Sequence, residues 1–172
     1  MKNKISLFGE GILSGLLYDE NHKLLNYKSS SFFNKLSNKY EVVNYSRKSM
    51  NSKMLVDILS KLIALKIKFK CIVINIGENE AMNCNNDLNA FKEFKNNLDK
   101  TIKICKANKI KAIFIGLPHN DNNSNFKLFN EEIMYQALAN GITYVNSSDV
   151  YYNVAYTIKG QNDIANNLFM AM

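Results

Sequence analysis

The sequence predicts an α/β fold in which a parallel sheet lies between two layers of helices. Short apolar runs rich in β-forming residues alternate with longer segments whose apolar residues follow helical spacing. The run from Cys71 to Ile76 is almost continuously apolar, as expected for a strand that is buried on both faces. Alternation of this kind implies parallel strands joined by right-handed crossovers. The length of 172 residues, 47% of them hydrophobic, predicts one domain over residues 1–172.

The first predicted strand, residues 4–8, leads into a glycine-rich turn. Gly9, Glu10 and Gly11 follow the apolar residues, and Gly15 comes a few residues later. An abrupt stop at glycine is typical of a buried strand that turns sharply into a loop or a helix. In an open parallel sheet, ligands bind in the crevice at the carboxyl ends of the central strands. We therefore expect the ligand site at this turn.

Further strands and helices follow in alternation. The strands are predicted at residues 40–45, 71–76, 112–116 and 142–145. Helices are predicted at residues 32–36, 126–139 and 162–172, and around two apolar stripes: Leu55, Ile58, Leu59, Leu62 and Ile63, and Phe91, Phe94, Leu98, Ile102 and Cys105. In the helix at 126–139, the residues expected to face inward are Phe129, Ile133, Ala137 and Leu138. Loops are predicted over the pocket at residues 16–27, and at 77–87, 119–125 and 146–161.

The net charge of +7 and the pI near 9.2 raise the question of nucleic-acid binding. Arg47 is the only arginine, and the lysines are dispersed through helices and helix ends. Because the planar guanidinium of arginine is what usually holds base edges and phosphates, this pattern favours a solvated lysine surface instead. The three cysteines include no CxxC pair. With no apolar leader and no run of membrane-spanning length, we expect a reducing, cytoplasmic compartment and no membrane partner.

The turns that follow the predicted strands resemble sequence blocks of the SGNH or GDSL hydrolase family. Gly9-Glu10-Gly11 stands where the family has Gly-Asp-Ser, and Gly77-Glu78-Asn79-Glu80 is similar to the family's Gly-x-Asn-Asp block. Ser49 stands at the glycine of the second block. The resemblance covers nearly the whole chain, and it implies a three-layer α/β/α sandwich with a five-stranded parallel sheet of flavodoxin-like order. It also implies that Asn79 and the backbone amide of Ser49 donate to the oxyanion of a substrate.

The residues that carry out ester hydrolysis in this family are missing. Gly11 holds the position of the nucleophilic serine, and a glycine has no side chain that attacks a carbonyl. Thr157 and Gly160 stand, within a residue or so, where the family has its aspartate and histidine, and no histidine follows His119. Because the base must lie beside the nucleophile to accept its proton, the usual triad cannot operate. The space at these small residues is either enlarged or filled by a neighbouring side chain.

Other residues at the same edge offer a relocated active site as an alternative. Ser14 lies one turn beyond the glycine-rich turn, and His119 follows the fourth predicted strand. Glu10, Glu78 and Glu80 flank two adjacent strand ends, where carboxylates pair for acid–base chemistry or for a hard cation. The resemblance favours a structural role for Glu10 and Glu80, which replace aspartates that hold the loops by hydrogen bonds. We therefore expect no metal and no cofactor.

These observations favour a catalytically inactive SGNH-like protein that serves as a binding, scaffolding or assembly module. Its expected ligand pocket surrounds Gly11, Ser49 and Asn79. The family's usual substrates suggest an acyl or acetylated-sugar ligand, and a protein partner or a second copy of the chain is also expected. The alternative is a weak or unconventional esterase or acyl-transfer enzyme that uses the residual oxyanion hole. A third alternative, nucleic-acid binding, rests on the lysine count alone.

Overall fold

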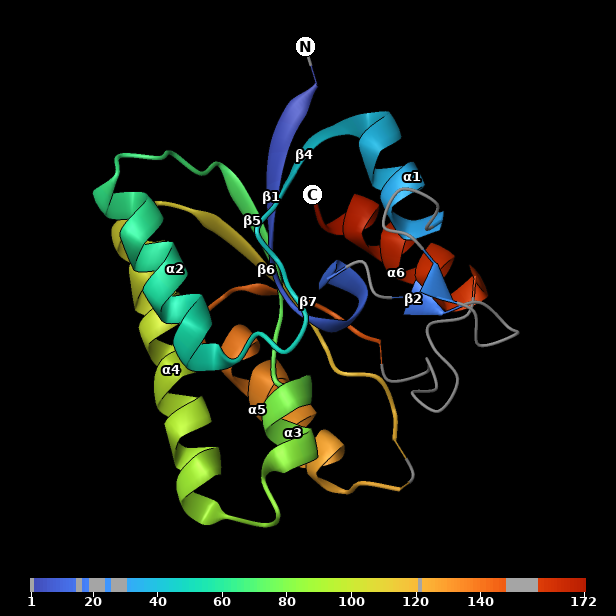
Figure 1. Ribbon diagram of the computed structural model, residues 1–172. Helices are drawn as coiled ribbons and strands as arrows, with labels where there is room; N and C mark the ends of the chain where they lie inside the picture. The colour runs from blue at the N-terminus through green and yellow to red at the C-terminus, as the bar shows by residue number, and fades with distance from the viewer. Residues whose placement is uncertain (1, 15–16, 19–23, 26–30, 121, 148–157) are drawn as a thin grey trace.

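The computed structural model has a central sheet of five parallel strands in the order β4-β1-β5-β6-β7 (Figure 1), and it describes residues 2–14, 17–18, 24–25, 31–120, 122–147 and 158–172. The strands are β1 (Asn3–Gly9), β4 (Tyr40–Asn44), β5 (Cys71–Asn75), β6 (Lys111–Ile115) and β7 (Thr143–Val145). The first strand lies between the second and the third of the five, which confirms the predicted α/β class and the flavodoxin-like order.

Helices cover both faces of this sheet, as Figure 1 shows. One face is covered by α2 (Ser52–Ala64), α4 (Leu88–Ala107) and α5 (Asn125–Ala139), and the other by α1 (Ser31–Lys39) and α6 (Ile158–Ala171). Successive residues of β5 serve the two cores in turn: Ile72 and Ile74 pack on the first side, and Val73 packs on the second. Burial on both sides accounts for the continuous apolar run in the sequence.

The helices on the first face begin at capping residues and bury the predicted stripes. The side chain of Asn51 accepts a hydrogen bond from the amide of Met54 (2.9 Å) at the start of α2. Asp87 accepts one from the amide of Asn89 (2.8 Å) at the start of α4. The buried members of the predicted stripes are Leu55, Leu59, Phe94, Leu98, Ile102 and Cys105 in α2 and α4, and Phe129, Ile133 and Ala137 in α5.

The prediction that Leu138 belongs to the core is wrong. It is 66% exposed, whereas its neighbour Ala137 is fully buried. At 3.6 residues per turn, Leu138 lies about 140° round α5 from the buried Ile133, so the two side chains cannot share one face. The outer face of α5 is therefore apolar as well as the inner one.

Three segments depart from the predicted loops. Residues 78–83 form the helix α3 (Glu78–Asn83), whose first-turn carboxylates suit the positive end of the helix dipole. Within residues 16–27, the short strands β2 (Leu17–Tyr18) and β3 (Leu24–Leu25) pair in antiparallel fashion. The last helix, α6, begins at Ile158 rather than at residue 162. The other predicted elements agree with the structure to within a few residues at their ends.

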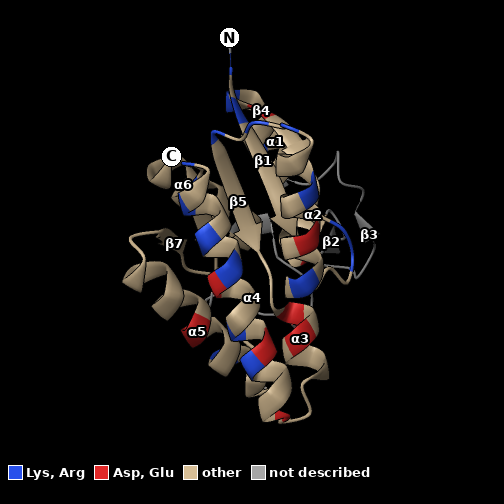
Figure 2. Cartoon of the chain, turned by 90° about the vertical axis from the view of Figure 1, so that its left-hand side faces the viewer, with Lys and Arg blue, Asp and Glu red and all other residues tan. Residues whose placement is uncertain are grey.

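The surface over α2 and α4 carries both signs of charge. Figure 2 shows basic and acidic residues interspersed along these helices. Lys103 pairs with Asp99 along α4 (2.5 Å), and Lys95 of α4 pairs with Glu132 of α5 (3.1 Å). Interspersed charges of this kind are typical of a solvated helix face. No helix in the described part of the chain is long and apolar enough to cross a membrane.

Candidate functional site

The ends of β1 and β5 lie side by side at the carboxyl edge of the sheet. Gly9 is in register with Asn75, and the amide of Glu10 donates to the carbonyl oxygen of Asn75 (2.9 Å). A Cβ atom on Gly9 would lie 1.7 Å from that oxygen, and the φ of Gly9 is +135°, a conformation that favours glycine. Only a glycine therefore permits the two strand ends to approach this closely.

The nucleophile position of the SGNH pattern holds a glycine, and neighbouring side chains would have to shift to admit a side chain there. Gly11 begins the 3-10 helix η1 (Gly11–Ser14) with a φ of +52°. A Cβ atom on it would lie 2.1 Å from Oε1 of Glu78 and 2.8 Å from Oδ1 of Asn75. Of the two alternatives that the sequence leaves open at Gly11, the structure therefore has the filled space. Both filling atoms are oxygens, so the space presents hydrogen-bond acceptors.

Glu10 connects the two turns through its carboxyl group. The residue is 4% exposed, and its Oε1 accepts hydrogen bonds from the amides of Gly77 (3.2 Å) and Asn79 (2.9 Å). Burial, followed by the nearby carboxyl of Glu78, raises the pKa of Glu10 to about 9. The Glu10 carboxyl is therefore protonated at neutral pH, and it holds the β5 turn as a neutral acceptor.

The other two acidic residues of this edge point in different directions. Glu78 is buried and faces Gly11. Glu80 instead accepts a hydrogen bond from the amide of Ser52 (2.5 Å) at the start of α2, and burial raises the pKa of its carboxyl. A pocket of about 210 Å³ between α2, α3 and α4 is lined in part by Asn79 and Glu80. The structure thus brings Glu10 and Glu78 to the β1 turn, and Glu80 to α2.

Of the two predicted oxyanion donors, Asn79 lies in α3 after β5 and Ser49 lies in the loop after β4, the two strands that flank β1. Asn83 donates to Oδ1 of Asn79 (3.0 Å), and among the described residues Nδ2 of Asn79 has no hydrogen-bond partner. Ser49 is exposed and has a φ of 57°, in the left-handed region that favours glycine. The loop that carries Ser49 is tied to β1, because the amide of Arg47 donates to the carbonyl of Gly9 (3.0 Å). The Asn79 side chain thus contacts Asn83, and the residue lines the pocket between α2, α3 and α4.

The remaining sequence-predicted residues are placed as follows. The hydroxyl of Ser14 donates to the carbonyl of Gly11 within η1 (2.8 Å). His119 is exposed beyond the end of β6, and Gly160 is buried in the first turn of α6. Thr157 lies outside the described residues. Of these residues, Ser14 contacts Gly11 directly, through its own hydroxyl.

Asn75 is a site residue that the sequence analysis missed. It is fully buried, and its Nδ2 donates to the carbonyls of Ile115 and Gly116 (both 3.2 Å), which links β5 to the end of β6. Its Oδ1 has no hydrogen-bond partner within the described part of the chain, and it is one of the two oxygens beside Gly11. The available signal was a polar side chain at the last position of an otherwise apolar strand.

In the described ranges, no three histidine, cysteine, aspartate or glutamate side chains gather in a way that suits a metal ion. The groups described at this edge are backbone amides, the Asn79 side chain and the buried oxygens of Glu10, Glu78 and Asn75.

No protein-family model and no curated protein sequence matches this chain. Solved structures do resemble it. A lipolytic protein of the G-D-S-L family from Desulfitobacterium hafniense has a TM-score of 0.75 and 17% identity, over 99% of this chain and 100% of that one. A GDSL-like lipase from Bacteroides thetaiotaomicron has a TM-score of 0.74 and 18% identity, over 98% and 87% of the two chains. Est24, a carbohydrate acetylesterase from Sinorhizobium meliloti, has a TM-score of 0.72 and 10% identity, over 97% and 96%. The chain therefore has the SGNH/GDSL hydrolase-like fold.

Proposed function

We propose that this chain is a non-hydrolytic SGNH-fold protein that serves as a binding, scaffolding or assembly module. The observation that carries the proposal is the surroundings of Gly11, where a side chain would lie 2.1 Å from a Glu78 oxygen. Nucleophilic catalysis needs a hydroxyl or thiol with a base in hydrogen-bond reach. At this position an ester carbonyl would meet a carboxyl oxygen instead.

The electrostatics of the two turns support the same proposal. An oxyanion is stabilised by donors that point at it before the reaction begins. Here the amides of Gly77 and Asn79 already donate to Glu10, and the oxygens of Glu78 and Asn75 face the nucleophile position. Negative charge that developed beside these oxygens would be repelled in a site of low dielectric constant. Ester hydrolysis is disfavoured on this ground also.

For the ligand, we infer an acyl or acetylated-sugar group at the crevice around Gly11, Ser49 and Asn79. The chemistry is suggested by the similar carbohydrate acetylesterase, and the Nδ2 donor of Asn79 suits a carbonyl acceptor. A reducing, cytoplasmic compartment is inferred from the cysteines, because Cys71, Cys84 and Cys105 are all free thiols.

A weak esterase or acyl-transfer enzyme is the second candidate. It is favoured by the Asn79 side chain, because one preorganised donor supports residual catalysis when a triad is absent. The nucleophile would then be a relocated serine, of which Ser14 is the nearest in sequence to Gly11. A nucleic-acid-binding protein, the third alternative, gains no specific support.

The two candidates are separated by labelling with a reactive fluorophosphonate, followed by intact-mass analysis beside a short-chain p-nitrophenyl ester assay. We expect no adduct and no turnover above buffer, while an active serine esterase treated in parallel is labelled fully. A stoichiometric adduct on a single serine would contradict the proposal. Loss of that adduct in Ser14→Ala would then identify the relocated nucleophile.

A further inference from the structure

The outer face of α5 exposes a row of large apolar side chains. Leu128, Tyr135 and Leu138 are 42%, 65% and 66% exposed, and Met134 beside them is 39% exposed. The charged residue Glu131 lies in the same row, and its side chain is 57% exposed. The row does not belong to the core, because α5 already buries Phe126, Phe129, Ile133 and Ala137 on its inner side. A helix that is apolar on both faces is typical of an element covered on both.

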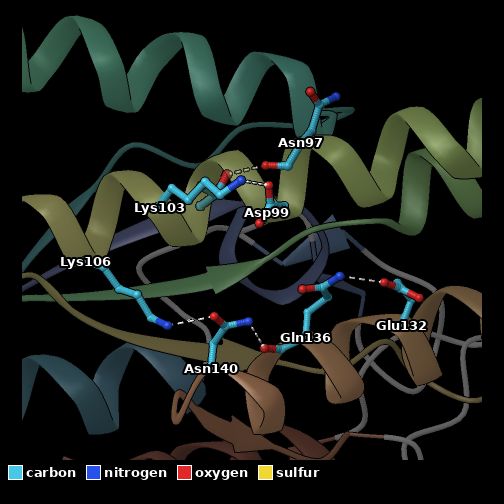
Figure 3. Close-up of polar contacts among 8 residues, drawn as sticks. Asn97, Asp99, Lys103, Lys106, Glu132, Gln136 and Asn140 are labelled. Atoms are coloured by element: carbon cyan, nitrogen blue, oxygen red, sulfur yellow. Dashed lines mark hydrogen bonds and ion pairs between the residues drawn. The ribbon is translucent and has the colours of Figure 1, made fainter.

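The polar side chains of α5 are committed elsewhere, so they do not compete for this face. Figure 3 shows Gln136 donating to Glu132 (2.9 Å) and Asn140 donating to the carbonyl of Gln136 (2.9 Å). Lys106 of α4 donates to Asn140 (2.7 Å), so this chain of contacts runs along the side of α5 that faces α4. The exposed row is therefore a separate face, with Lys127 and Glu131 as the exposed charges of α5.

The spacing of the row is symmetric. Leu128, Glu131, Tyr135 and Leu138 are separated by three, four and three residues, which is the spacing of the seam in a two-helix coiled coil. When a second α5 lies antiparallel across the row, Leu128 of one copy meets Leu138 of the other. Glu131 likewise meets Tyr135, whose hydroxyl is a donor for a carboxylate acceptor. The face is thus complementary to itself in shape and in hydrogen bonding.

The charge of the face also fits a second copy. Each chain carries a net charge of +7, so most faces of two copies would repel each other. On the outer side of α5, Lys127 and Glu131 form an ion pair (4.0 Å), which leaves this face neutral. Contact through this neutral side of α5 therefore adds no repulsion of its own between two copies.

We propose that two copies of this chain associate through the outer faces of α5, antiparallel about a twofold axis that crosses the outer face between Glu131 and Tyr135. Such a contact is isologous, because the same residues contribute on both sides. A contact between single helices is smaller than the roughly 800 Å² per partner of a standard interface, so the dimer is weak and depends on concentration. The inference goes beyond the proposed crevice and does not depend on whether esters are hydrolysed.

The first test is sedimentation equilibrium from micromolar to submillimolar concentration. We expect the mass to rise from 19.7 kDa toward twice that value. In Leu138→Glu, a charge opposite Leu128 should raise the dimer dissociation constant about tenfold or more. Met170→Glu is the matched control, because Met170 is 88% exposed on α6 and lies on the other side of the sheet. Circular dichroism checks that both variants fold.

The second test fixes the orientation by cross-linking. In an antiparallel pair, Leu128→Cys and Leu138→Cys chains should form a disulfide when mixed under mild oxidation, and neither should do so alone. The native Cys84 and Cys105 are buried, and Cys71 is half-buried, so the unmodified chain is the background control. A monomer at every concentration, an unchanged dimer in Leu138→Glu, or cross-links in the single-variant samples would each overturn the proposal. A complex with another protein's apolar helix but not with itself would do so too.

Discussion

The turns after β1 and β5 are neighbours at one edge of the sheet, yet they contribute different chemical groups. The β1 turn contributes glycines, one of them at the nucleophile position, and the carboxyl of Glu10. The β5 turn contributes donors, namely the amides of Gly77 and Asn79 and the Asn79 side chain. In the β1 turn, a Cβ on Gly9 would clash with the backbone of Asn75. In the β5 turn, a Cβ on Gly77 would contact only side chains, the nearest being the ring of Phe94 at 3.1 Å.

Different residues of the β1 turn therefore set its backbone conformation and occupy its nucleophile position. The backbone path is held by the close approach of Gly9 to Asn75 and by the hydrogen bonds of Glu10. The fold thus forms with a glycine at position 11 and with the Glu10 carboxyl joining the two turns. From the contrast between the two turns we make four predictions, in order of decreasing size of effect.

Gly9→Ala tests the backbone contact between the turns. A Cβ atom 1.7 Å from a carbonyl oxygen, at a φ of +135°, cannot be relieved by a side-chain rotation. We expect a loss of about 4 kcal/mol or more in the free energy of unfolding. The control is Gly141→Ala, which has a φ of +66° and no atom within 4 Å, and it should cost only about 1–2 kcal/mol. Equal losses in urea unfolding would show that the strand ends do not depend on this contact.

Glu10→Gln tests the carboxyl that joins the turns. The unfolded carboxyl loses its proton near its ordinary pKa of 4.5, and the folded one near about 9, so the folded chain binds more protons between these values. Stability should therefore be greatest below about pH 4.5 and fall as the pH rises toward 9, by up to about 1.4 kcal/mol per pH unit.

Glutamine keeps the acceptor oxygen and does not ionise. The free energy of unfolding in urea should therefore depend less on pH in Glu10→Gln than in the unmodified chain between about pH 5 and pH 8. The matched control is Glu41→Gln, because the Glu41 side chain is 62% exposed. Two parallel curves for the unmodified chain and Glu10→Gln would contradict the raised pKa of this carboxyl.

Gly11→Ser returns a hydroxyl to the nucleophile position. The clash is with the end of the Glu78 side chain, which can rotate, so we expect a loss of about 1–3 kcal/mol. Glu78→Ala in the same chain should recover part of this loss in a double-mutant cycle. Neither variant should gain ester hydrolysis or a fluorophosphonate adduct, because no base is supplied. Turnover in Gly11→Ser alone would show that the rest of a hydrolytic site is present.

Ser49→Gly extends the comparison to the loop after β4. Ser49 has a φ of 57°, so glycine should relieve the strain and stabilise the chain by about 0.5–1 kcal/mol. Lys48→Gly is the control, because Lys48 is exposed and does not have a positive φ, and it should destabilise the chain. A loss of stability in both variants would mean that the Ser49 side chain is required.

The strands could be predicted because burial on both faces gives them a local sequence signature. The run Cys71–Asn75 is an example, and its continuous apolar character is absent from the surrounding loops. The helix α3 was missed because its six residues are mostly polar and too few to show a period. Leu138 was misplaced because an apolar residue on the outer face looks the same in sequence as one on the inner face.

The site was predictable only in part. Its location followed from the order of strands, because a strand end flanked by two parallel neighbours sets the edge at which ligands bind. The filling of the space at Gly11 by Glu78 could not be predicted, because it depends on two segments far apart in sequence and on the direction of one side chain. The Asn75 oxygen, which has no partner among the described residues, likewise depends on where β6 ends.

The position of β1 within the sheet has a consequence for synthesis on the ribosome. Its residues pair with β4, as in Asn3 with Tyr40, and with β5, as in Ser6 with Ile72. Because β1 leaves the exit tunnel before β4 and β5, it must wait for β5 before both of its edges are covered. During this interval an unpaired, hydrophobic edge is exposed in the nascent chain, which is the kind of surface that chaperones shield from aggregation. A slower translation of residues 41–75 should prolong this exposure, whereas a delay well after β5 has emerged should not.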